Sequence, residues 1–166
     1  MKAEFLNPFV YAGMKVLSAE AGLKKWVPDK PYLVRLDATR QPVSVVVGVV
    51  GSVTGLVIFG MSLAVAKGLV RAMAGSTLSI KDPLAESAIG EVGNLITGLA
   101  SGLLEENGYP CRISPPALVV GTAVRITAVT VPMVAVPITT ELGEIKIFLG
   151  LNELHSAPDS HAKHTG

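Results

Sequence analysis

One carboxylate and one carboxamide in this chain have the spacing of side chains that act together on one helix face. Glu91 and Asn94 are three residues apart, and Ser87 stands four residues before Glu91. Side chains with these spacings lie on the same face of a helix. The carboxylate accepts hydrogen bonds, whereas the amide both donates and accepts them. Asn is also a poor choice for a helix interior unless its amide has a use, because it competes for backbone hydrogen bonds.

A long helix is predicted to carry these residues. Asp82-Pro83 has the form of an N-cap followed by a first-turn proline, and Gly108 and Pro110 end the pattern, so the helix is expected over residues 83–107. At roughly 100° per residue, its side chains sort into an apolar and a polar stripe. The apolar stripe is predicted to contain Ile89, Val92, Ile96, Leu99 and Leu103. The polar stripe contains Ser87, Glu91, Asn94, Gly98, Ser101 and Glu105.

Glycines distinguish this polar stripe from an ordinary solvated helix face. Each Gly costs about 1 kcal/mol relative to Ala in a helix interior. Gly98 lies one turn beyond Asn94 on the same stripe, where a missing side chain leaves room for another molecule to approach. Gly90 and Gly93 lie to the side, where they can instead serve packing within the domain.

The remaining elements predict an α+β fold, with an antiparallel sheet and three helices and with the long helix exposed on one face. Asn7-Pro8 is interpreted as a cap and first-turn proline of a helix running towards Gly22, and Ser62 as the cap of a helix that Gly75 ends. Strands at 43–50 and 53–59 are expected to form a hairpin with both faces covered. Further extended segments are predicted at 32–36, 119–129, 132–138 and 143–149, with a turn at residues 141–143.

Chain length and composition limit the class of protein. Residues 1–154 are predicted to form a single domain, and residues 155–166 a polar mobile tail whose three His are not expected to hold an ordered metal. A net charge of +1 gives no basic patch for nucleic acid. The one cysteine, Cys111, is interpreted as a small buried hydrophobe.

An uncharged run, residues 42–66, is long enough to span a bilayer. Its valines are interrupted by Gly and Ser, which favours two buried strands over one membrane helix. The alternative, a protein that crosses the membrane with residues 42–66, predicts insolubility without detergent. The first residues lack the pattern of a secretory signal, so a cytoplasmic location is expected.

Ser87, Glu91 and Asn94 stand in the segment SAIGEVGNLITG, with Pro115 and Pro116 further along the chain. A Ser or Asp, then Glu, then Asn at these spacings on a long helix, followed by a proline, is the hallmark of the CheC/CheX/FliY chemotaxis phosphatases, which this chain resembles. The flanking segments VTGLVIFGMS and ISPPALVVG also resemble that family, so the similarity covers most of residues 43–125.

A second E-x-x-N segment, Glu4 to Asn7, is interpreted as coincidence because Asn7 is assigned as a helix cap. Relatives of the CheC kind carry two copies of the motif. The chain therefore resembles the single-site CheX kind.

The resemblance implies a phosphatase that acts on the phospho-aspartate of a CheY-like response regulator. The regulator would supply Mg²⁺ and a lysine, and the phosphatase would have no cofactor or metal of its own. Asn94 would hold a water in line with the phosphorus, and Glu91 would pair with the lysine. Ser87 would lie at the edge of the interface or orient Glu91, or be an ordinary surface serine. Gly98 would give the docking regulator room.

The resemblance also suggests a homodimer in which the sheet continues from subunit to subunit. The apolar strands within residues 131–149 make such pairing plausible, because an uncovered edge there would favour aggregation.

Two other interpretations remain open at the level of sequence. One is a non-catalytic module that docks receiver domains or a flagellar switch component; the intact Glu91/Asn94 pair favours the enzyme. The other is a structural protein whose own chain covers the polar stripe.

Overall fold

A single antiparallel sheet and three α-helices make up the computed structural model, which describes residues 3–35, 41–124 and 132–154. The helices are α1 (Leu6–Ala21), α2 (Leu63–Ala74) and α3 (Pro83–Glu106), and a 3₁₀ turn (Ala3–Phe5) precedes α1. The strands are β1 (Val27–Pro28), β2 (Tyr32–Val34), β3 (Val43–Gly51), β4 (Val53–Met61), β5 (Cys111–Ile113), β6 (Ala117–Val120), β7 (Met133–Thr140) and β8 (Gly143–Glu153). The α+β fold expected from the sequence is confirmed.

The sheet is built around two hairpins. Its strand order is β1-β7-β8-β4-β3-β5, with β2 also paired to β7 and β6 also paired to β3. The β3–β4 hairpin turns at Gly51-Ser52, as predicted, with Val49 opposite Gly55. The β7–β8 hairpin turns at Glu141-Leu142, also as predicted, with Thr140 opposite Gly143. These four long strands form the platform on which the helices pack.

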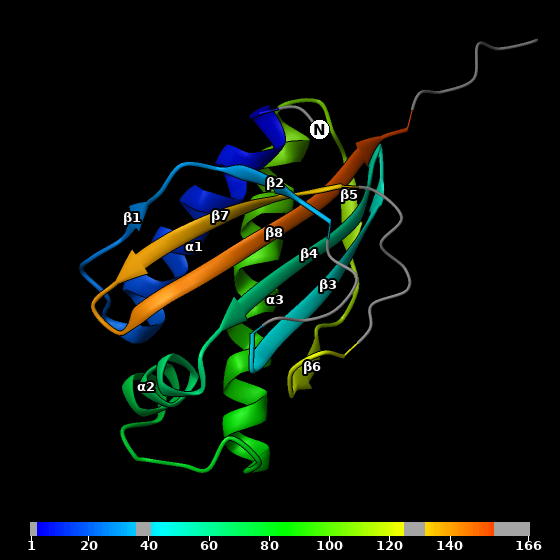
Figure 1. Cartoon of the computed structure of the whole chain (residues 1–166). Helices are drawn as coiled ribbons and strands as arrows, with labels where there is room; N and C mark the ends of the chain where they lie inside the picture. Colours follow the sequence, from blue (N-terminus) through cyan, green and yellow to red (C-terminus); the bar gives the residue numbers. More distant parts are fainter. Residues whose placement is uncertain (1–2, 36–40, 125–131, 155–166) are drawn as a thin grey trace, which may run out of the picture.

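All three helices lie on one face of this sheet, with α1 and β5 on opposite sides of α3 (Figure 1). Two of their predicted caps are confirmed. Ser62 Oγ accepts a hydrogen bond from the Val65 backbone N–H at 3.2 Å, and the Asp82 carboxylate accepts one from the Leu84 N–H at 2.9 Å. Each cap satisfies a helix N–H group that has no partner within its own helix.

The predicted N-cap at Asn7 is wrong. Helix α1 begins at Leu6 after the 3₁₀ turn, and Asn7 lies within the first helical turn. The residue at the cap position is Phe5, which makes no side-chain capping bond. Pro8 is still tolerated, because the N–H groups of the first turn have no partner within the helix. Asn7 is therefore not occupied as a cap.

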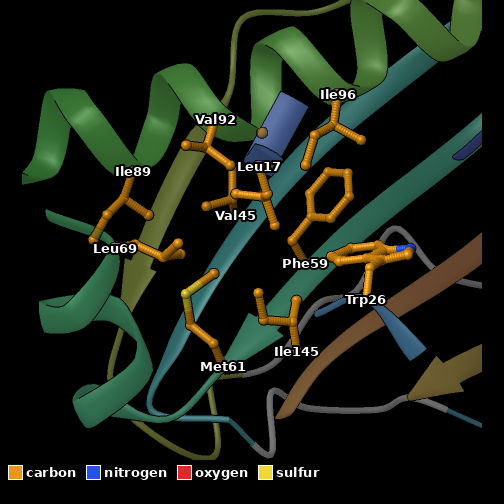
Figure 2. A pocket seen from close by; sticks show the side chains of 11 residues that line it. Leu17, Trp26, Val45, Phe59, Met61, Leu69, Ile89, Val92, Ile96 and Ile145 are labelled. Atoms are coloured by element: carbon orange, nitrogen blue, oxygen red, sulfur yellow. The ribbon is translucent and has the colours of Figure 1, made fainter. Parts of the chain in front are cut away.

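The main core lies between the helices and the sheet. Figure 2 shows Ile89, Val92 and Ile96 of α3 facing side chains of β3 and β4, with Leu17 of α1 and Leu69 of α2 beside them. Gly93 is required here, because a Cβ at this position would lie 2.5 Å from Val45 Cγ1. Gly93 therefore serves packing within the domain, which is one of the uses expected for it from the sequence. These contacts fix the rotation of α3 about its own axis.

The predicted apolar stripe of α3 is only partly right. Ile89, Val92 and Ile96 are buried, but Leu99 is 40% exposed and Leu103 is half-buried. The predicted stripe repeats every seven residues, whereas a straight helix makes a turn every 3.6 residues, so such a stripe drifts by about 20° per heptad. The buried face instead continues through Ala100 and Leu104. Leu99 consequently lies beside the polar stripe.

The face of the sheet opposite the helices carries a second, smaller group of buried side chains. Ile58, Met133, Ala135 and Phe148 form it, with Val46 packed against them. Both faces of the β3–β4 hairpin therefore carry buried residues, as its valine-rich sequence predicted. Within the described ranges, no helix is long and apolar enough to cross a membrane.

Several strands differ from the prediction. The strand expected at 119–129 is β6, which begins at Ala117 and ends at Val120; residues 121–124 are not strand, and 125–129 lie outside the described residues. β1 and β5 were not predicted. They are two and three residues long, and their positions depend on distant partners, since β1 pairs with β7 and β5 with β3. The predicted tail, residues 155–166, also lies outside the described part.

Strand β7 is paired along both edges, which bears on the predicted homodimer. β7 has β8 on one side and β1 and β2 on the other, so it does not form an open edge. A sheet that continues between subunits would have to use the outer strands on either side instead. The homodimer therefore remains a prediction, and β7 does not provide the uncovered strand edge that made the pairing plausible.

Candidate functional site

The polar stripe of α3 faces away from the sheet, because the opposite face of the helix is held in the core. Ser87 and Glu91 are exposed, and Asn94 is half-buried. Glu91 and Asn94 stand one helical turn apart, so their Cβ atoms are about 5–6 Å from each other. The helix thus presents a carboxylate and an amide side by side, as the sequence predicted.

These polar groups have no partners within the described part of the chain. Among those residues, no hydrogen bond or ion pair is made by the side chain of Ser87, Glu91 or Asn94. The polar stripe is not covered by the described residues of its own chain, which argues against the structural-protein alternative. The carboxylate and the amide therefore keep their hydrogen-bonding capacity for another molecule.

A hollow adjoins Asn94 on this exposed face. Gly98 lines it, and an added Cβ there would meet only Ile113 Cδ1 of β5, at 3.8 Å. Figure 1 shows α1 and β5 on opposite sides of α3, and both of these elements contribute residues that line the hollow. The residues that line it, called here the Gly98 hollow, are Lys15, Val16, Ala19, Glu20, Asn94, Leu95, Gly98, Leu99 and Ile113. The open space predicted next to Gly98 is present.

The segment after α3 lies against the same helix. A Cβ at Gly90 would be 3.7 Å from Pro116 Cγ, so this proline packs beside α3 near Glu91. The Ser114 hydroxyl accepts a hydrogen bond from the Gly48 backbone N–H at 2.8 Å, which ties the segment to β3. The proline of the motif thus helps to support the helix from the side.

The second E-x-x-N segment, Glu4 to Asn7, has a different environment. The Glu4 carboxylate accepts a hydrogen bond from the Tyr109 hydroxyl at 2.8 Å. Glu4 and Asn7 line a separate shallow depression near the start of α1, together with Tyr11, Leu103 and Asn107. Glu4 is therefore used within the fold, unlike Glu91.

Cys111 shows no sign of an activated thiol. It is half-buried in β5, and burial, assisted by the nearby negative charge of Glu105, raises the pKa of its thiol. A raised pKa keeps the group in the less nucleophilic thiol form. In the described ranges, no group of three or more His, Cys, Asp or Glu side chains is arranged to hold a metal ion.

Sequence reasoning missed part of this site. Lys15, Ala19 and Glu20 come from α1, and Ile113 comes from a strand that was not predicted. Their proximity to Asn94 depends on the packing of α1 and β5 against α3, for which the sequence has no local signal. Leu99 was assigned to the core, and its exposure beside Gly98 would have been found with a strict 3.6-residue period.

Comparison with known families and proteins identifies the relatives of this chain. The model of the chemotaxis phosphatase CheX family matches residues 43–139. A curated relative, the CheY-P phosphatase CheX of Thermotoga maritima, is 36% identical over 127 residues, which make up 76% of this chain and 81% of the relative. The family match includes the whole of α3, and hence Ser87, Glu91, Asn94 and Gly98.

Solved structures agree with this result. A crystal structure of the chemotaxis protein CheX from Desulfovibrio desulfuricans has a TM-score of 0.80 and 31% identity, and the match covers 90% of this chain and 99% of that one. The CheX–CheY–BeF₃–Mg²⁺ complex from Borrelia burgdorferi matches with a TM-score of 0.74 and 25% identity, covering 90% of this chain and 98% of that one.

Proposed function

Because the chain belongs to the CheX family of chemotaxis phosphatases, we propose that it hydrolyses the phospho-aspartate of a CheY-like response regulator through the Glu91/Asn94 face of α3. The observation that carries the assignment of the site is the exposed pair itself. Neither side chain has a hydrogen-bond or ion-pair partner among the described residues, and Asn94 borders the Gly98 hollow. The pair offers hydrogen-bonding groups, and no described side chain forms a hydrogen bond that would activate the nearby Ser87 hydroxyl as a nucleophile, so the face is suited to assisting an attack by water.

Asn94 is the residue that would act on the water. Its amide can accept a hydrogen bond from the water and donate one to a phosphoryl oxygen. Holding the water in line with the phosphorus replaces a random encounter by a fixed geometry, which is a large part of catalysis in phosphoryl transfer. A carboxylate at this position would repel the negative phosphoryl group, whereas the amide is neutral. The half-buried position of Asn94 also restricts the directions that its amide can take.

Glu91 would fix the register of the complex. Its exposed carboxylate can form a charge-assisted hydrogen bond with a lysine of the regulator. The pair Glu91 and Asn94 then makes two contacts, one helical turn apart, with two groups of the regulator's active site. Ser87, one turn before Glu91, would lie at the margin of this interface.

The regulator is proposed to supply the metal. The complex from Borrelia burgdorferi contains CheX, CheY, BeF₃ and Mg²⁺. By analogy, this chain would need no metal or cofactor of its own, and Mg²⁺ would neutralise phosphoryl charge within the partner. The cytoplasmic location and the homodimer expected from the sequence remain predictions.

The direct test is phosphate release from a phosphorylated CheY-like receiver domain. The receiver is phosphorylated with a small phosphodonor, freed of the donor, and mixed with substoichiometric amounts of this chain. We expect each molecule of the chain to dephosphorylate many receivers. Chelation of Mg²⁺ after phosphorylation should abolish the stimulated rate.

The same assay separates the enzyme from the non-catalytic docking module. A docking module would bind the phosphorylated receiver in a pull-down or by calorimetry, yet leave its rate of phosphate loss unchanged or slower. That result for every CheY-like receiver of the source organism would reject the phosphatase.

A further inference from the structure

The Gly98 hollow has no role in the chemistry described above, although Asn94 forms part of its wall. We propose that this hollow receives an apolar side chain of the receiver domain, next to the receiver's phosphorylation site, and that Gly98 and Leu99 thereby determine affinity for the regulator. The inference rests on the proposed function, because it assigns a further contact to the same interface.

The walls of the hollow are largely apolar. Leu95 and Leu99 of α3, Ala19 of α1 and Ile113 of β5 line it. Leu99 is 40% exposed, while the other leucine of α3 at that level, Leu95, is half-buried. A single exposed leucine on a protein surface is ordinary. Several apolar side chains gathered around a depression are instead typical of the centre of a binding site.

Gly98 keeps the hollow open, and the chain's own packing does not require it. A Cβ at Gly98 would make one ordinary contact, 3.8 Å from Ile113, so alanine fits there. Gly93 is different, since a Cβ there would lie 2.5 Å from Val45. A helix-interior glycine lowers helix stability relative to alanine. Internal packing explains Gly93 but neither Gly98 nor Gly102. Of these two, only Gly98 lines the hollow beside Asn94, so the open space there is best explained by a molecule that enters it.

The position of the hollow specifies which molecule this is. Gly98 is four residues after Asn94, about 6 Å along the helix axis. A standard protein interface covers about 800 Å² on each partner, which corresponds to a radius of about 16 Å. A receiver that accepts Asn94 into its active site must therefore also cover the hollow. An apolar side chain that fills it would displace water from apolar walls, which favours binding.

The rim of the hollow is charged. Lys15 and Glu20, both exposed on α1, border it. A polar rim around an apolar centre is the usual arrangement of a protein interface. We therefore expect the receiver to present an apolar side chain flanked by polar or charged groups.

The test uses binding rather than turnover. The probe is a CheY-like receiver domain loaded with beryllofluoride and Mg²⁺, which holds the phosphorylated form without hydrolysis, and the dissociation constant is measured by calorimetry. Gly98→Leu fills the hollow and should weaken binding at least about tenfold. The control is Glu106→Leu, an exposed position on the same helix that lies about 18 Å beyond Asn94 along the axis and therefore outside the interface radius of about 16 Å. The control should bind within about twofold of the wild type, and thermal melting of both variants checks that they fold.

A second variant makes the test independent of Gly98→Leu. Leu99→Ser removes an exposed apolar wall without adding bulk, and should weaken binding by about threefold to tenfold. Unchanged binding in both Gly98→Leu and Leu99→Ser would overturn the inference, as would equal weakening in Gly98→Leu and the control Glu106→Leu. In these cases the wild-type chain would still dephosphorylate the receiver. Failure of the proposed function would look different, because the wild type would then not accelerate phosphate loss from any receiver.

Discussion

Two segments of this chain have the same E-x-x-N spacing but different surroundings. Glu91 and Asn94 lie within the 24-residue helix α3, on its exposed side. Glu4 lies in a 3₁₀ turn and accepts a hydrogen bond from Tyr109, and Asn7 lies in the first turn of α1. The first pair is free of internal partners within the described residues, whereas the carboxylate of the second pair is used by the fold.

The contrast shows that spacing alone does not define a site. A carboxylate that already accepts a hydrogen bond from its own chain has part of its accepting capacity used and its orientation fixed by that bond. The continuous helix α3 also holds Glu91 and Asn94 at a fixed separation, whereas the segment from Glu4 to Asn7 crosses from a 3₁₀ turn into α1. Asn7 does not cap a helix, contrary to the prediction, so capping does not set the second segment apart. The hydrogen bond between Glu4 and Tyr109 does.

The largest difference is expected between the two asparagines. Asn94→Ala should lower kcat for dephosphorylation of the receiver on the order of 10²-fold, because the water loses its positioning group. Asn7→Ala should leave kcat within about twofold. Steady-state phosphate release measures both, and equal losses in the two variants would remove the distinction between the segments.

The glutamates should differ by a smaller factor. Glu91→Gln keeps the shape of the side chain but removes its charge, and should lower kcat/KM for the phosphorylated receiver by about tenfold. Glu4→Gln should have no effect on kcat/KM, because its amide oxygen can still accept from Tyr109. High salt should reduce the gap between wild type and Glu91→Gln, since screening weakens an exposed ion pair. A larger effect for Glu4→Gln than for Glu91→Gln would reverse the assignment.

The glycines of α3 allow a test of stability that does not involve the partner. Gly93→Ala should destabilise the fold by about 1–3 kcal/mol, because its Cβ would clash with Val45 in the core. Gly102→Ala should stabilise it by up to about 1 kcal/mol, because nothing lies within 4 Å and alanine is the better helix former. Urea unfolding gives both values. A stabilising Gly93→Ala would contradict the packing of α3 on β3.

The smallest effect is expected at the second E-x-x-N segment, Glu4 to Asn7. Tyr109→Phe removes the hydroxyl that donates to Glu4 but keeps the ring, which packs edge-to-face on Phe5 at a centroid distance of 5.0 Å. The loss should be about 0.5–1 kcal/mol of unfolding free energy, with activity unchanged. A change in kcat without a change in stability would indicate that this segment takes part in the reaction.

Local signals predicted much of the fold. The caps at Ser62 and Asp82 and the hairpin turn at Gly51-Ser52 are defined by a few neighbouring residues, and all three are confirmed. Pairing between distant segments has no such signal, so β1 and β5 were missed. These two strands also change the surface, because β1 and β2 cover the edge of β7 and β5 contributes Ile113 to the Gly98 hollow.

The candidate site was predicted in part for the same reason. The polar stripe depends only on helical geometry, so the sequence alone predicts that Ser87, Glu91, Asn94 and Gly98 share one face. The surroundings of that face depend on how α1 and β5 pack against α3. A seven-residue repeat predicted Leu99 to be in the core. The structure shows that α3 is rotated so that Leu99 is exposed.

The central claim is that Asn94 acts on the water and not on docking. The most direct measurement is made on Asn94→Ala, with its affinity for the beryllofluoride-loaded receiver determined beside its single-turnover rate of phosphate release at saturating concentration. We predict an affinity within about threefold of the wild type and a rate lower on the order of 10²-fold. A wild-type rate at saturation, with the whole defect in affinity, would contradict this account.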